Sequence, residues 1–263
     1  MANGLQSEVI LSAGAAALAL VWVIMLAPQV ARTISACLRL RLVKNIEATR
    51  RSSIDELMPS VLSKYARRLA LRSLSAAWLA AFAVLWIRVG ISSGPALAYT
   101  AFFAVLFLLS LIDLDTQLLP GLLVGTVLWA GVLAAAFNLV PLPLEKAVLG
   151  TAAGWLLFTL PGWALALART NEHPAVGAGD VSLIAACGAW LGPQSVIVAG
   201  CMAVIAALVI RCIIGTQGYK GKSPKVSHDQ KTIVLNSYLP FGPLISMASI
   251  AVLCLDPYHY FLT

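Results

Sequence analysis

Residues 101–120 read AFFAVLFLLSLIDLDTQLLP, an apolar run that ends in two aspartates and, five residues later, a proline. A bilayer core about 30 Å thick is crossed by roughly 20 predominantly apolar residues in a helix. The run therefore predicts a membrane-spanning helix near residues 95–114, with Asp113 and Asp115 at its end.

The composition extends this prediction to the whole chain. Of its 263 residues 60% are hydrophobic and only 11% are charged, and the mean hydropathy is +0.89. These values are typical of a protein whose main solvent is lipid. We predict an all-α, polytopic integral membrane bundle with a first helix and basic loop over 1–72 and a membrane-embedded domain over 73–263. The eight apolar runs lie near 8–30, 73–91, 95–114, 119–140, 146–168, 181–193, 195–214 and 234–255.

The positive charges predict the orientation. Ten of the eighteen Lys and Arg residues lie between Arg32 and Arg72, and six more fall at or in the loops near 169–180 and 215–233. Positively charged loops stay in the cytoplasm, so these three loops are expected on the cytoplasmic face and both termini on the opposite face. The net charge of +7 is thus interpreted as a topology signal, and no nucleic-acid partner is expected.

Cysteine and histidine do not indicate a metal site. The five cysteines contain no C-x-x-C pair, and His173, His228 and His259 lie far apart in the sequence. A disulfide framework or a zinc site is not expected, because each needs closely arranged ligands.

Three aspartates are candidates for a catalytic site. Carboxylates at membrane depth are costly and usually functional. The predicted topology brings Asp113, Asp115 and Asp180 to one cytoplasmic face. Asp113 and Asp115 point about 200° apart on a helix, so only one of them is expected to pair with Asp180. Two close carboxylates share a proton, as aspartic peptidases require. The alternative is a simple helix cap at Asp180, with Asp113 and Asp115 among lipid headgroups.

Two glycine-containing segments accompany these acids. Gly177 and Gly179 precede Asp180 and allow a close backbone approach at a helix start. The segment Pro240-Phe241-Gly242-Pro243 opens the last apolar run and leaves backbone groups that could bind an extended substrate. A plain helix start explains this second segment equally well.

At these residues the sequence resembles the type IV prepilin peptidases, bacterial members of the GxGD class of intramembrane aspartyl proteases. Three pieces carry the resemblance in the family's order, and it covers roughly residues 65 to 255. They are Ile112-Asp113-Leu114-Asp115-Thr116-Gln117-Leu118-Leu119-Pro120, then Gly177-Ala178-Gly179-Asp180-Val181 continuing through Gly188-Ala189-Trp190-Leu191-Gly192, then Leu239-Pro240-Phe241-Gly242-Pro243.

The resemblance implies an aspartic-type endopeptidase in the bacterial inner membrane. Its catalytic pair is expected to be Asp115 and Asp180, with Asp113 as a nearby supporting carboxylate. The implied partners are membrane lipids and type IV prepilins or pseudopilins, whose short basic leader is cut at the cytoplasmic face. The oligomeric state is left open.

The sequence also departs from the family's pattern. Paired C-x-x-C motifs are common in the family's first loop, whereas residues 31 to 72 contain only Cys37. We therefore expect cleavage without assuming N-methylation, and no cofactor, with S-adenosylmethionine needed only if methyltransferase activity is retained. Gly121 stands where an acidic residue is usual, and Ser182 where lysine is usual.

Two other functions are compatible with intramembrane aspartates. A proton-coupled transporter uses such carboxylates as a relay, although no inverted repeat is visible in this sequence. An inactive relative would bind pilins without cutting them.

Overall fold

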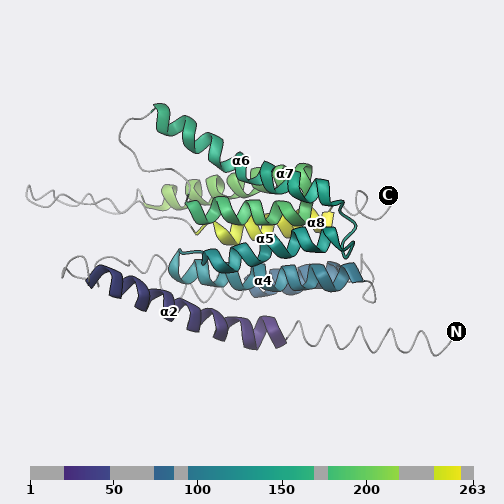
Figure 1. The fold of residues 1–263 in the computed structure, drawn as a ribbon. Coiled ribbons are helices and arrows are strands. Elements are labelled where there is room, and N and C mark those ends of the chain that lie inside the picture. Colours follow the sequence, from purple (N-terminus) through teal and green to yellow (C-terminus); the bar gives the residue numbers. More distant parts are fainter. Residues whose placement is uncertain (1–20, 48–73, 86–93, 169–176, 219–239, 256–263) are drawn as a thin grey trace, which may run out of the picture.

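The computed structural model describes residues 21–47, 74–85, 94–168, 177–218 and 240–255, and all regular secondary structure in these ranges is helical (Figure 1). The predicted all-helical fold is thus confirmed over these ranges. In chain order the elements are a π-helix η1 (Trp22–Leu26), α2 (Ala27–Glu47), a helix at Leu74–Leu85, α4 (Gly94–Thr116), α5 (Gly121–Ala136), α6 (Leu144–Ala168), α7 (Ala178–Gly218) and α8 (Gly242–Leu255).

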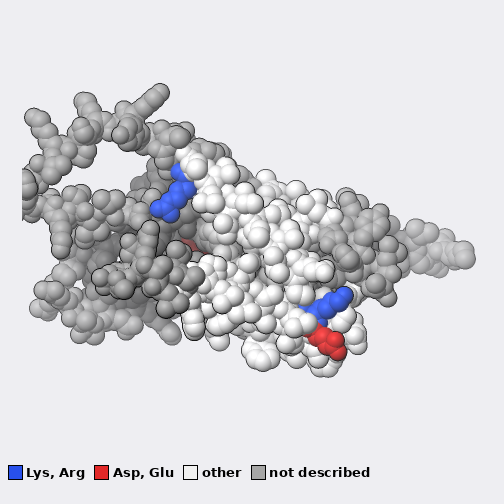
Figure 2. Space-filling view, turned by 90° about the horizontal axis from the view of Figure 1, so that it is seen from above, with Lys and Arg blue, Asp and Glu red and all other residues white. Residues whose placement is uncertain are grey.

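The outer surface of the bundle is apolar. Leu122, Phe137 and Trp163 are 83%, 71% and 67% exposed. Figure 2 shows charged side chains of the described residues only toward the two ends of the face it presents. Among the described helices, the stretches Pro95–Thr116 and Ala178–Cys212 are long and apolar enough to cross a membrane. Such a surface would be a liability in water and is suited to lipid.

Tryptophan side chains join α4 to its neighbours. The indole N–H of Trp78 donates to the Phe103 carbonyl at 2.9 Å, and that of Trp22 donates to the Ala104 carbonyl at 3.2 Å. On another side Trp190 of α7 stacks on Phe102, with ring centroids 4.7 Å apart. Buried indoles need such partners, so these contacts determine how α4 is rotated in the bundle.

The long helix α7 is two antiparallel segments joined at Gly192. This residue has φ 78° and ψ 175°, a backbone conformation that favours glycine. Gly200, eight residues after the turn, lies against Ile184, eight residues before it: a Cβ at Gly200 would be 3.9 Å from Ile184 Cδ1. The sequence-based division near Gly192 and Pro193 agrees with this turn.

Helices α6 and α7 approach each other closely through glycines. A Cβ on Gly150 would lie 2.2 Å from the Gly188 carbonyl oxygen, and one on Gly188 would lie 2.1 Å from the Gly150 carbonyl oxygen. Further along, a Cβ on Gly154 would lie 2.6 Å from the Ile184 carbonyl oxygen. Small residues at these positions let the two backbones touch, as is common between membrane helices.

The helix bounds follow the expected apolar runs with one clear difference. The first run was expected to end near residue 30, but the helix continues as α2 to Glu47. A helix does not have to end where its apolar stretch ends, because its backbone hydrogen bonds persist in water. For the runs at 8–30, 73–91 and 234–255, residues 8–20, 73, 86–91 and 234–239 lie outside the described residues.

One end of the bundle collects the segments that matter for the site. In Figure 1 the end of α4, the start of α5, both ends of α7 and the start of α8 lie toward the left. The turn at Gly192 and the connection from α5 to α6 lie at the opposite end. This arrangement brings Asp113, Asp180 and Gly242 to the same end of the molecule.

Candidate active site

Two carboxylates meet where α4 ends and α7 begins. Asp113 is only 4% exposed, although it is charged in its ordinary state. Asp180 is the third residue of α7 and is partly buried. The two carboxylates are close enough for their charges to interact. Two acids in such a place cannot both ionise cheaply, so they are suited to hold one proton between them.

A third helix end completes the arrangement. The backbone N–H of Gly242, the first residue of α8, donates to Asp113 Oδ2 at 2.9 Å. The first N–H groups of a helix have no partner within it, so a carboxylate there satisfies one of them. This hydrogen bond holds the Asp113 carboxylate in a defined orientation.

Gly242 must lack a side chain to make this contact. A Cβ at this position would lie 2.8 Å from Asp113 Oδ2 and 3.0 Å from Asp113 Cγ. Sequence reasoning had identified Pro240, Phe241, Gly242 and Pro243 only as a possible substrate site. The role of the Gly242 N–H toward Asp113 was missed, since no sequence pattern shows which carboxylate the segment meets.

The remainder of this segment starts α8. The Phe241 carbonyl accepts hydrogen bonds from the N–H groups of Leu244 and Ile245, at 3.1 and 3.0 Å. The Phe241 ring packs edge-on against Phe158 of α6, with centroids 5.7 Å apart. Pro243 is buried and Pro240 is partly buried. The segment is thus both a helix start and the support of Asp113.

The glycines before Asp180 have separate roles. A Cβ on Gly177 would lie 3.2 Å from Asp180 Oδ2, and the Gly177 carbonyl accepts the Asp180 N–H at 3.0 Å. A Cβ on Gly179 would instead lie 3.1 Å from the Cβ of Leu119, in the connection between α4 and α5. One glycine makes room for the carboxylate, and the other lets α7 pack against the α4–α5 connection.

Asp115 lies two residues beyond Asp113 on α4. It is half-buried and has contacts of its own. Helix geometry turns it about 200° from Asp113. The helix continues past it, because the Thr116 hydroxyl donates to the Ile112 carbonyl at 2.9 Å and the Gln117 N–H donates to the Asp113 carbonyl at 2.8 Å. The charge interaction with Asp180 involves Asp113. Asp113 is the acid that the sequence predicts only as the supporting carboxylate.

The described residues offer no second group of ligands near these acids. Among the described residues, no cluster of three or more His, Cys, Asp or Glu side chains is arranged to hold a metal ion. His173, His228 and His259 lie outside the described residues.

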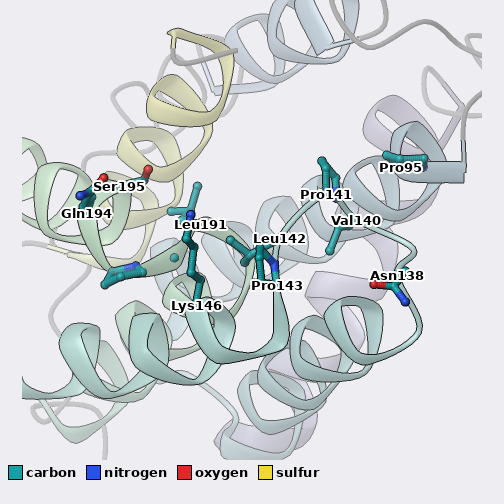
Figure 3. Close-up of a pocket in the computed structure, with 12 residues that line it drawn as sticks. Pro95, Asn138, Val140, Pro141, Leu142, Pro143, Lys146, Leu191, Gln194 and Ser195 are labelled. Atoms are coloured by element: carbon teal, nitrogen blue, oxygen red, sulfur yellow. The ribbon is translucent and has the colours of Figure 1, made fainter. Parts of the chain in front are cut away.

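A cavity of about 520 Å³ lies at the other end of the bundle. Figure 3 shows its lining, drawn from the start of α4, the connection between α5 and α6, and the turn within α7. Lys146, Gln194 and Ser195 are its polar members near α6 and α7. None of the three aspartates lines it, so it is separate from the carboxylate pair.

Residues 100–215 match the model of the type IV leader peptidase family. The chain is 34% identical over 168 residues to a "Type 4 prepilin-like proteins leader peptide-processing enzyme" of Escherichia coli, which covers 62% of this chain and 54% of the relative. It is 42% identical over 113 residues to a "Prepilin leader peptidase/N-methyltransferase" of Dickeya chrysanthemi, covering 41% of this chain and 38% of the relative.

A similar match is found with a "Prepilin leader peptidase/N-methyltransferase" of Burkholderia pseudomallei, 32% identical over 174 residues, covering 65% of this chain and 50% of the relative. The chain thus spans about half the length of the curated relatives it matches, or less. No solved structure matches it significantly.

Proposed function

Because the chain belongs to the type IV leader peptidase family through residues 100–215, we propose that it is an intramembrane aspartic endopeptidase. Its substrates are type IV prepilins or pseudopilins, from which it removes the short basic leader. The observation that carries the proposal is the buried Asp113 carboxylate, which interacts with Asp180 and accepts the Gly242 N–H.

The carboxylate pair supports a two-acid hydrolysis. The ionised aspartate takes a proton from water, whose oxygen attacks the scissile carbonyl carbon. The protonated aspartate donates to the carbonyl oxygen, and a tetrahedral diol forms. Its collapse breaks the C–N bond as a proton passes to the leaving amine. No metal or organic cofactor is needed for these steps.

The geometry favours Asp113 over Asp115 as the partner of Asp180. Asp113 is the more buried acid, interacts with Asp180 and receives a backbone hydrogen bond. The sequence-based hypothesis named Asp115, and helix geometry makes the two alternatives exclusive. We therefore assign the catalytic role to Asp113 and Asp180, with Asp115 outside the pair.

Single substitutions separate these assignments. Asp113→Asn and Asp180→Asn are each expected to lower leader cleavage by about 10²- to 10⁴-fold, the usual loss for a missing acid–base group. Asp115→Asn is the matched control and is expected to keep substantial cleavage. The measurement is the gel shift of a co-expressed prepilin at equal enzyme level in membranes. Full cleavage by Asp113→Asn, with none by Asp115→Asn, would restore the sequence-based assignment.

The same assay distinguishes the alternative functions. A transporter or an inactive pilin-binding relative would leave the leader intact in the wild type as well as in both variants. A proton relay would instead show uptake or pH changes that depend on Asp113 and Asp180 without any cleavage.

We further propose eight membrane spans in the bacterial inner membrane, with the carboxylate pair at the cytoplasmic face. The apolar outer surface, the turn at Gly192 and the basic residues of α2 and of the segments near 48–72, 169–180 and 211–231 support this topology. A pilin whose first helix is itself a span would then present its leader junction at the depth of the aspartates.

Methylation is not part of the proposal. Residues 31 to 72 contain only Cys37, which cannot form a four-ligand thiolate site alone. Mass spectrometry of the mature pilin terminus is expected to show cleavage without an added methyl group. A methyl group whose presence depends on this enzyme would show that the protein is also an N-methyltransferase and needs S-adenosylmethionine.

A further inference from the structure

A row of small polar residues runs inward from the carboxylate pair along α8. Gly242, Ser246 and Ser249 are spaced by four and then three residues, so they lie on one face of this helix. Gly242 begins the row at Asp113. The serines follow one and two helical turns deeper in the bundle, and the second is about 10 Å from the level of Gly242.

Both serine hydroxyls are buried, and among the described residues neither has an oxygen or nitrogen partner. Ser246 and Ser249 are each 0% exposed. Within the part of the chain that the structure describes, Ser246 Oγ makes no hydrogen bond, and Ser249 Oγ has beside it the Cys187 thiol, a weak hydrogen-bonding group. A buried hydroxyl without a partner is unfavourable, because it has lost water and gained nothing in exchange. Two such hydroxyls on one helix face therefore indicate that a small polar molecule binds between the helices.

A matching row lies on the first half of α7. Cys187 follows Asp180 by seven residues, so it lies on the same face two turns deeper. The Cys187 side chain is 0% exposed and lies beside the Ser249 hydroxyl. The rows on α7 and α8 thus begin at the carboxylate pair and meet again at Cys187 and Ser249.

Another buried serine near the pair differs in an informative way. Ser110 of α4 is 0% exposed and lies one turn before Asp113, but its hydroxyl donates to the Leu106 carbonyl at 2.8 Å. Its hydrogen-bonding need is met within its own helix. Burial alone therefore does not leave a serine unpaired in this bundle. Ser35 of α2 is also buried without a hydrogen bond among the described residues, but Ser246 and Ser249 lie on the helix whose first residue contacts Asp113.

We propose that Ser246, Ser249 and Cys187 form an internal water site that supplies the carboxylate pair from inside the bundle. A water molecule takes two to four hydrogen bonds from buried polar groups. The serine hydroxyls both donate and accept, and Ser246 lies between the deeper site and Asp113. This proposal rests on the proposed hydrolysis, in which each turnover consumes one water molecule. Ser246 and Ser249 act as positioning residues for that water.

The Cys187 thiol provides a direct probe of water in this site. In a variant with alanine at Cys37, Cys201, Cys212 and Cys254, the S–H infrared band reports Cys187 alone. In D₂O we expect S–H to convert to S–D while the bundle stays folded. With Ser246→Ala and Ser249→Ala together, conversion is expected to slow by at least about tenfold, since an apolar cavity stays dry. Ser110→Ala is the matched control and leaves the rate unchanged.

Two outcomes of this measurement overturn the proposal. One is that Cys187 exchanges only when the bundle unfolds, as a dry core requires. The other is that the double serine variant exchanges as fast as the parent. Circular dichroism and thermal melting on the same samples identify any variant that has lost its fold, and Ser246→Ala alone then replaces the double variant.

The peptidase assay tests whether this water is used. Ser246→Ala is expected to lower kcat by about tenfold with KM unchanged, and Ser246→Thr, which keeps the hydroxyl, is expected to restore it. If Ser246→Ala slows exchange at Cys187 but leaves kcat normal, the site does not supply water to the carboxylate pair. If the wild type cuts no prepilin, the proposed function fails, whereas exchange at Cys187 still reports whether the water site exists.

Discussion

Asp113 is held by two groups that come from distant parts of the chain. Asp180 brings a second charge to it, and the Gly242 N–H orients its Oδ2. A displacement of about 1 Å at a reacting group costs on the order of a hundredfold in rate. The lack of a side chain at Gly242 is therefore expected to affect the cleavage rate as strongly as many catalytic side chains do.

Gly242→Ala is expected to lower leader cleavage by about a hundredfold, because its Cβ would lie 2.8 Å from Asp113 Oδ2. Gly121→Ala is the control, since a Cβ there meets nothing within 4 Å. Cleavage rates at equal folded enzyme level provide the comparison. Equal losses in both variants would show that the Asp113 contact is not responsible.

Gly177→Ala is expected to have a weaker effect than Gly242→Ala. Its Cβ would lie 3.2 Å from Asp180 Oδ2, the far end of a side chain that can shift by a few tenths of an ångström. We expect a loss of about tenfold, measured in the same assay. A loss larger than that of Gly242→Ala would mean that Asp180 tolerates displacement less than Asp113 does.

At the scale of elements, the α6–α7 contact sets the position of Asp180. The two backbones touch at Gly150 and Gly188, and the turn at Gly192 returns the chain across the bundle. Backbone atoms cannot move aside as a flexible side chain can. The first segment of α7 is therefore fixed against α6 at the end remote from the site.

Gly188→Ala is expected to destabilise the bundle by about 1–3 kcal/mol, the usual cost of overpacking. Its Cβ would lie 2.1 Å from the Gly150 carbonyl oxygen. Thermal unfolding in detergent measures the change, with Gly125→Ala as control, because a Cβ at Gly125 meets nothing within 4 Å. A melting temperature equal to that of the control would contradict the close approach.

For the whole molecule, the two ends of the bundle are expected to lie on opposite sides of the membrane. Gln194 is exposed beside the turn within α7, and Cys212 is exposed near the other end of α7. From the basic residues near both ends of the loop that follows α7, we expect the end of Cys212 to face the cytoplasm. The cavity beside Gln194 would then open on the outer side.

In a variant whose only cysteine is introduced by Gln194→Cys, a membrane-impermeant maleimide is expected to label intact spheroplasts. A variant that keeps only Cys212 is expected to react after permeabilisation alone. Labelling is read by gel shift. The reverse pattern would invert the topology and move the carboxylate pair to the outer face.

The sequence by itself was sufficient to predict that the protein is surrounded by lipid, that its fold is all-helical and that the three aspartates share one end of the bundle. Apolar runs of membrane length, grouped positive charges and glycines before Asp180 are local patterns, so they are present in the sequence whatever the packing. The presence of Asp113, Asp115 and Asp180 at one end follows from the order and length of those runs.

Only the tertiary structure decided which acid faces Asp180. Asp113 and Asp115 have the same chemistry and similar neighbours in sequence, and they differ mainly in their direction on α4. That direction depends on how α4 packs against Trp22 and Trp78, which donate hydrogen bonds to its carbonyls, and against Trp190, which stacks on Phe102. The meeting of Gly242 with Asp113, 129 residues away, likewise depends on packing. Helix rotation is a property of the assembled bundle, because no single segment contains the contacts that set it.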